Sequence, residues 1–172
     1  MSVFGAICGG RASQVSDLLR TYLQDHHAGA TVGVELARRT AGSNEDTEYG
    51  EPLARIADQI AEDRETLERV MERLGVKPNP IKDAGGWAAE KLGRLKPNNQ
   101  LLGYSPLSRV VELEGLVIGV TGKLALWEAL RDSIGDRLDG IDFVALGTRA
   151  QGQRAELEEL RRKAAAEAFE RD

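Results

Sequence analysis

The stretch 53–74, LARIADQIAEDRETLERVMERL, carries the clearest periodic pattern in the chain. Its apolar residues recur at alternating steps of three and four, which places their side chains on one face of an α-helix. This face consists of Leu53, Ile56, Ile60, Leu67, Val70 and Leu74, and Asp63 interrupts it. The pattern predicts a long amphipathic helix that packs its apolar face against other helices.

Local signals extend this prediction to four long helices and no strand. Ala, Leu, Glu and Arg dominate most of the chain, and these residues favour helix. The four helices are expected after Ser13 or Ser16 up to about Thr40, from Gly50 to Gly75, from Pro106 to about Ser133, and from Asp139 or Asp142 almost to the end. The fold class is therefore all-α, with a flexible segment over residues 1–12 and a single helical domain over 13–172.

The lengths of the connections predict how the helices are arranged. Short turns join the first helix to the second and the third to the fourth, so each pair should form an antiparallel hairpin. About 30 residues separate the pairs, with a short helix beginning at Pro80. A segment of this length can travel the whole length of the helices, so the third helix can begin at the same end as the second. This is the one-crossover arrangement of ferritin-like four-helix bundles; an up-down bundle with a side excursion is the alternative.

Several glycines lie inside the predicted helices, where each costs about 1 kcal/mol relative to alanine. They are Gly29, Gly33, Gly115, Gly119, Gly122, Gly147 and Gly152. We expect them to let helix backbones approach closely, or to make room for Trp87, Trp127 or Phe143. A cavity for a ligand is the functional alternative.

Composition excludes several classes of partner. The 172 residues carry a formal net charge of -5, which argues against nucleic acid because phosphate binding needs a basic surface. No apolar run approaches the roughly 20 residues that span a bilayer, and the start of the chain makes a poor signal peptide. The single cysteine, Cys8, cannot form an internal disulfide, which fits a reducing compartment. We therefore expect a cytoplasmic protein without nucleic-acid or membrane partners.

A polar cluster is predicted in the core, formed by His26, Asp63, Glu114, Arg149 and Gln153. Glu114 has only valine and isoleucine three and four residues away, which suggests a carboxylate within an apolar stripe. A buried carboxylate must be protonated, paired or metal-bound, and Arg149 could supply the matching cation. We favour a structural network that fixes the helix register over a ligand or catalytic site.

The two histidines are adjacent, and their helical neighbours place His26 on the inner face and His27 at its boundary. Adjacent side chains point about 100° apart on a helix, so the pair cannot chelate one ion. A mononuclear metal site that uses His26 with Asp63 or Glu114 remains an alternative, because histidine and carboxylates are common ligands. The favoured expectation is a protein without metal or cofactor.

Four stretches resemble a group of uncharacterised bacterial helical proteins that are classed by shape as ferritin-like. They are LLRTYLQDHHAG (18–29), EKLGRLK (90–96), LEGLVIGVTGKLALWEAL (113–130) and RAQGQRAELEELR (149–161). The resemblance implies the fold and supplies no functional residues. Ferritin-like di-iron proteins place Glu-x-x-His on two helices, whereas the second and fourth helices here offer only Glu62-x-x-Glu65 and Glu156-x-x-Glu159.

Two classes of function follow from these patterns. The favoured one is a non-enzymatic helical protein that acts through a protein partner or as a homodimer, with the polar cluster serving the fold. The alternative is a small-ligand or mononuclear-metal site, and with it an enzyme, around Glu114 and His26. A deep pocket that reaches Glu114 would favour the alternative, whereas a filled core with an apolar surface patch would favour association.

Overall fold

The computed structural model describes residues 15–79 and 104–170. This part of the chain folds into the long helices α1 (Asp17–Gly42), α2 (Gly50–Arg73), α5 (Pro106–Ile134) and α6 (Phe143–Phe169), with one 3-10 turn, η1 (Gly135–Arg137). Within these residues there is no strand, so the all-helical prediction is confirmed for them. The predicted short helix at Pro80 and the segment 1–12 lie outside the described residues.

Side-chain caps explain where three of the helices begin. The hydroxyl of Ser16 accepts a hydrogen bond from the amide of Leu19 at 3.2 Å, and the hydroxyl of Ser105 accepts one from the amide of Ser108 at 3.1 Å. The carboxylate of Asp142 accepts one from the amide of Ala145 at 2.9 Å. Each bond satisfies an amide that has no partner within the first turn of the helix.

The helix α2 has no side-chain cap and instead begins in a tight turn. A Cβ atom on Gly50 would lie 2.6 Å from the carbonyl oxygen of Glu45 and 2.8 Å from that of Asn44. These oxygens belong to the backbone and cannot move aside easily. Glycine is therefore required at Gly50 for the close approach of the turn to the start of α2.

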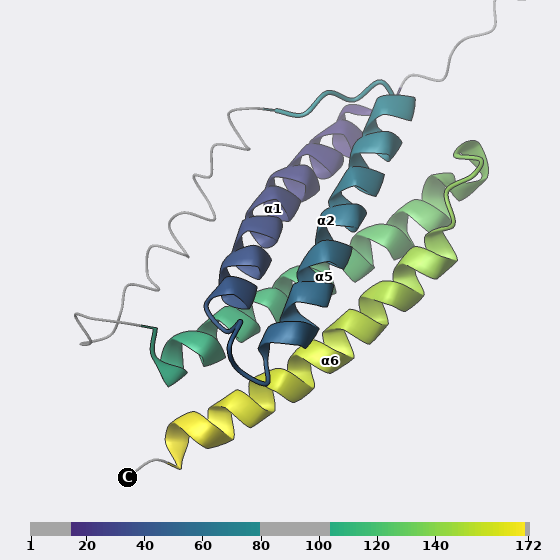
Figure 1. The fold of residues 1–172 in the computed structure, drawn as a ribbon. Helices are drawn as coiled ribbons and strands as arrows, with labels where there is room; N and C mark the ends of the chain where they lie inside the picture. Colours follow the sequence, from purple (N-terminus) through teal and green to yellow (C-terminus); the bar gives the residue numbers. More distant parts are fainter. Residues whose placement is uncertain (1–14, 80–103, 171–172) are drawn as a thin grey trace, which may run out of the picture.

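Contacts at the two ends of the helices establish their directions (Figure 1). Near the start of α5, Asn44 donates a hydrogen bond to the hydroxyl of Tyr104 at 2.9 Å, and Arg109 donates one to Asn44 at 2.6 Å. At the far end, Arg73 donates to the backbone carbonyl of Asp139, just after α5. The start of α5 lies beside the start of α2, and the end of α5 lies beside the end of α2. The two helices therefore run in the same direction, and α5 begins at the same end as α2, which the length of the connecting segment permits.

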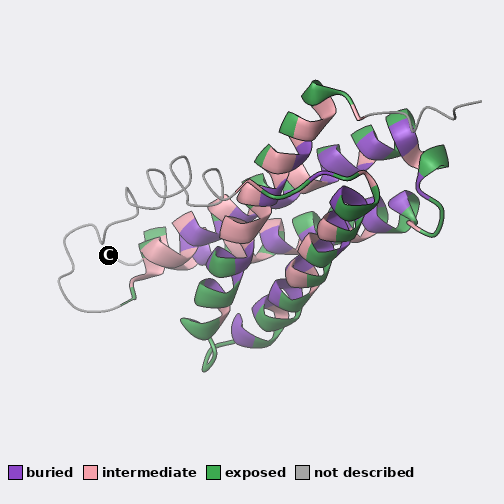
Figure 2. Ribbon diagram, turned by 90° about the horizontal axis from the view of Figure 1, so that it is seen from above, coloured by how far each residue is buried: buried purple, intermediate pink, exposed green. Residues whose placement is uncertain are grey.

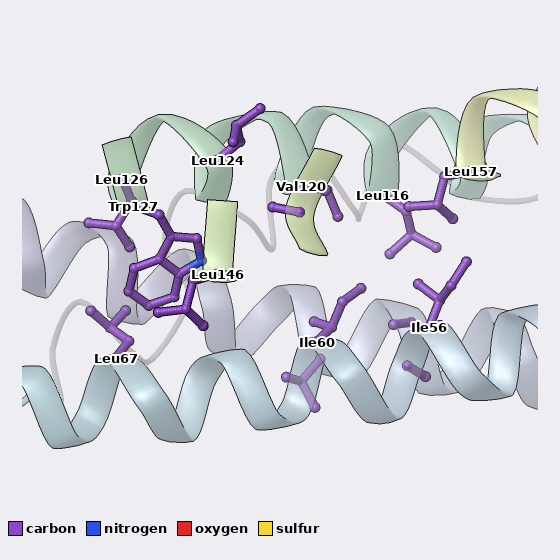
Figure 3. Close-up of a cluster of buried hydrophobic side chains, with 14 of the residues drawn as sticks. Ile56, Ile60, Leu67, Leu116, Val120, Leu124, Leu126, Trp127, Leu146 and Leu157 are labelled. Carbon is purple, nitrogen blue, oxygen red and sulfur yellow. The ribbon is translucent and has the colours of Figure 1, made fainter. Parts of the chain in front are cut away.

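The core lies between the two hairpins, and the inner side of each helix is buried while the outer side is exposed (Figure 2). In Figure 3, Ile56, Ile60 and Leu67 of α2 face the side chains of α5 and α6. The α5 residues drawn there include Leu116, Val120, Leu124, Leu126 and Trp127. The predicted apolar face of α2 is confirmed, since all of its members are buried except Leu74, which is half-buried. Burial of this apolar surface is the main force that holds the hairpins together.

Close packing accounts for few of the internal glycines. A Cβ atom on Gly115 would lie 3.1 Å from Leu36 Cδ2, where α5 crosses α1, and one on Gly147 would lie 3.9 Å from Leu124 Cδ1. No atom of the described part comes within 4 Å of such a Cβ at Gly29, Gly33, Gly119, Gly122 or Gly152. Among the described residues the expectation of close helix approach is therefore wrong for these five, and Trp87, for which the glycines were also expected to make room, lies outside the described residues.

Candidate functional site

A buried polar cluster lies where Asp63 interrupts the apolar face of α2. The carboxylate of Asp63 is 2% exposed and accepts hydrogen bonds from Lys123 of α5 and Arg149 of α6. Gln153 of α6 accepts a hydrogen bond from Lys123 Nζ at 2.5 Å, and its amide nitrogen lies 3.4 Å from Asp63 Oδ2. The structure therefore joins three of the predicted residues, Asp63, Arg149 and Gln153, and adds Lys123.

Charge is balanced within this cluster. Arg149 also donates to Glu62 at 3.0 Å, so two carboxylates face two cations. The amide nitrogen of Gln153 donates to Gln59 at 3.1 Å. Burial lowers the pKa of the Lys123 ammonium, and the charge of Asp63 opposes this shift. Because each charge already has a partner inside the protein, the cluster resembles a structural network more than a site prepared for a substrate.

Sequence reasoning missed Lys123, although a signal was present. It is the only charged residue between Glu114 and Glu128, a stretch of otherwise apolar, glycine or threonine residues on α5. Lysine in such a setting either reaches the surface or pairs internally. The side chain of Lys123 is 14% exposed and pairs internally with Asp63.

The prediction that Glu114 is buried is wrong. Its side chain is 49% exposed, and its Oε1 lies 3.7 Å from the guanidinium of Arg161 of α6. The error arose because α5 has apolar residues on nearly all sides, so apolar neighbours do not identify its inner face. Ile118, one of those neighbours, is itself 69% exposed.

The buried carboxylate of α5 is Glu112. Its side chain is 9% exposed, and it accepts hydrogen bonds at 3.0 Å from Arg39 of α1 and from the hydroxyl of Tyr104. Tyr104 in turn accepts a hydrogen bond from Asn44 in the turn between α1 and α2. Burial raises the pKa of Tyr104, so the hydroxyl keeps its proton and donates to Glu112. These bonds tie the start of α5 to the end of the first hairpin.

The orientations predicted for the histidines are reversed. His27 is buried and its Nε2 lies 3.1 Å from Glu68 Oε1 of α2, which also accepts a hydrogen bond from Arg64 at 2.8 Å. His26 is half-buried, with its ring 4.5 Å from the ring of Tyr22, and burial lowers its pKa. The reason is that the face of α1 that packs on α2 passes through His27. His26 therefore lies outside the polar cluster.

The described residues offer little that would hold a metal or a small ligand. Among them, no three His, Cys, Asp or Glu side chains come together as a metal site would require. A solvent-open hollow of about 500 Å³ is lined by Glu62, Arg149 and residues at the start of α6, and another of about 520 Å³ lies at the end of α2. Neither hollow is lined by Glu114 or His26. In this part of the chain no helix is both long and apolar enough to cross a membrane.

The outward side of α5 carries an apolar surface that we call the α5 stripe. Its members are Leu107, Val111, Ile118, Gly122, Ala125 and Ala129. Ile118 is 69% exposed and Leu107 is 38% exposed. The stripe contains no charged residue, and the carboxylate at its edge, Glu114, lies beside Arg161. Aliphatic side chains and Gly122 thus share one side of a long helix.

Comparisons of the chain with protein-family models, with curated proteins and with solved structures found no match.

Proposed function

We propose that this chain is a ferritin-like four-helix protein that acts by binding another protein molecule, and that the α5 stripe is the binding surface. The observation that carries the proposal is Ile118, which lies in the middle of α5 with 69% of its surface exposed. Exposed apolar surface on one side of a helix is typical of protein interfaces.

The contrast with α2 supports this choice of surface. The exposed side of α2 carries charges along its length, among them Arg55, Asp58, Glu65 and Glu72. On α5, the residues from Gly115 to Trp127 include only one charge, that of Lys123, and this side chain turns inward. A helix that is solvated on its outer side normally has charged and polar residues there. The α5 stripe lacks them.

The polar cluster around Asp63 fits a structural role in this proposal. Its four charges are paired across α2, α5 and α6, and so they specify which residues of these helices face one another. The alternative of a ligand or mononuclear-metal site around Glu114 and His26 loses its support, because Glu114 points outward. The cytoplasmic location remains an expectation based on the single cysteine.

Site-specific photocrosslinking tests the proposed surface. A photoreactive phenylalanine derivative replaces Ile118 in one variant and Val144 in another; Val144 is an apolar residue of α6 that is 62% exposed and lies off the stripe. We expect irradiation to give an adduct of defined mass from position 118 and none from position 144. The same products from both positions, or none from position 118, would contradict the proposal.

A further inference from the structure

Resting on the proposed function, we infer that the partner on the α5 stripe is a second copy of this chain. The two α5 helices pack antiparallel about a two-fold axis at the level of Val120. In this register the side chain of Ile118 lies over Gly122 of the second copy, and the same contact repeats on the other side of the axis, as an isologous interface requires.

The stripe has the shape that this packing needs. At 100° per residue its members fall within an arc of about 60° on α5, and they extend over about 33 Å. The arc is narrow enough to form the contact seam of two helices. Gly122 lowers the surface beside Ile118, and no atom of the described part approaches within 4 Å of its Cβ position.

Large and small residues alternate so that the stripe is complementary to itself. A two-fold axis at Val120 pairs residues that lie equally far before and after this position. It sets Ile118 against Gly122 and Val111 against Ala129, so each branched side chain meets a small residue. A stripe that recognised an unrelated protein would not need this internal match.

The size and charge of the surface predict a weak dimer. A footprint of about 33 Å by roughly the 10 Å width of a helix gives on the order of 300 Å² per copy from α5 alone. A specific interface needs about 500 Å² per partner or more, so flanking side chains must contribute and the dimer should be reversible. Each copy carries a net charge of -5, and salt should therefore strengthen the association by screening the repulsion.

Disulfide trapping tests both the partner and the register, with Cys8→Ser as the background. Ile118→Cys and Gly122→Cys are prepared separately and are oxidised alone and as a mixture. In the proposed register the two cysteines of the mixture lie opposite each other. Two cysteines at position 118 lie about 6 Å apart along the helix axis, which is too far for ready bridging. We expect the mixture to give at least several times more cross-linked dimer than either variant alone.

A second pair of cysteine variants tests the same register independently, in case Ile118→Cys or Gly122→Cys disrupts the interface. Val111→Cys with Ala129→Cys should show the same excess in the mixture, while Val144→Cys, off the stripe, should give no dimer above background. Excess cross-linking of one variant with itself would overturn the antiparallel register. Absence of dimer from both mixtures would overturn the second copy as the partner. If the mixtures gave no dimer but photocrosslinking at position 118 gave an adduct with a different protein, the proposed function would be retained. If position 118 gave no adduct either, both the proposed function and the second copy as partner would be wrong.

Discussion

Replacing Asp63 with alanine should be among the most destabilising single changes in the described part of the chain. Asp63 is 2% exposed, and two cations on two other helices donate hydrogen bonds to it. Its removal leaves Lys123, which is 14% exposed, without a carboxylate inside the core. Breaking a buried pair in this way costs about 3–5 kcal/mol. In a protein of this size each kcal/mol lowers the midpoint of thermal unfolding by about 2–4 °C.

The adjacent residue provides the matched control. Glu62 pairs with the same Arg149 at 3.0 Å, but its side chain is 63% exposed. Glu62→Ala should therefore change the free energy of unfolding by no more than about 0.5 kcal/mol. Both values come from urea denaturation followed by circular dichroism. A loss for Asp63→Ala as small as that for Glu62→Ala would refute the argument that the cluster stabilises the fold.

Glu112→Ala should cost about 1–3 kcal/mol, because it removes the acceptor of two hydrogen bonds, from Arg39 and from Tyr104, whereas Glu114→Ala should change the stability by less than about 0.5 kcal/mol; equal losses in urea denaturation would be inconsistent with the assigned burial. Gly50→Ala should destabilise by about 1–3 kcal/mol through its clash with backbone oxygens, while Gly152→Ala, which meets open space, should stabilise by up to about 1 kcal/mol; thermal unfolding checks both signs. Burial lowers the pKa of His26 below its ordinary 6.5, so protonation favours the unfolded chain and stability falls as the pH drops below 6.5; an NMR titration that placed this pKa at or above 6.5 would contradict the assignment.

Helix positions could be predicted from the sequence because they depend on local chemistry. The caps Ser16, Ser105 and Asp142 act within one turn of their own helices, and residue type narrowed the first to Ser13 or Ser16 and the last to Asp139 or Asp142. The inner face of α2 was equally predictable. Asp63 is the only charged residue on the apolar face of α2, so only one side of this helix can pack against the core.

The candidate site was less predictable because α5 and α1 do not identify their own inner faces. The apolar residues of α5 lie on nearly all sides of the helix. Only its packing against the other helices decides that Glu112 is buried and Glu114 is exposed. The same holds for α1, because only its packing against α2 decides that His27 is buried and His26 is half-buried. Helix-to-helix register arises from packing between elements, and a single sequence contains only indirect information about it.

Whether the α5 stripe joins two copies of the chain is measured directly by the molar mass in solution as a function of concentration. We predict by sedimentation equilibrium that the 18.7 kDa chain moves toward twice this mass as the concentration rises through the micromolar range. Ile118→Lys should remain a monomer, because it places a charge in the seam, and Val144→Lys should behave as the unaltered protein. A chain that stays monomeric at every concentration, or Ile118→Lys and Val144→Lys variants that associate equally, would contradict the account.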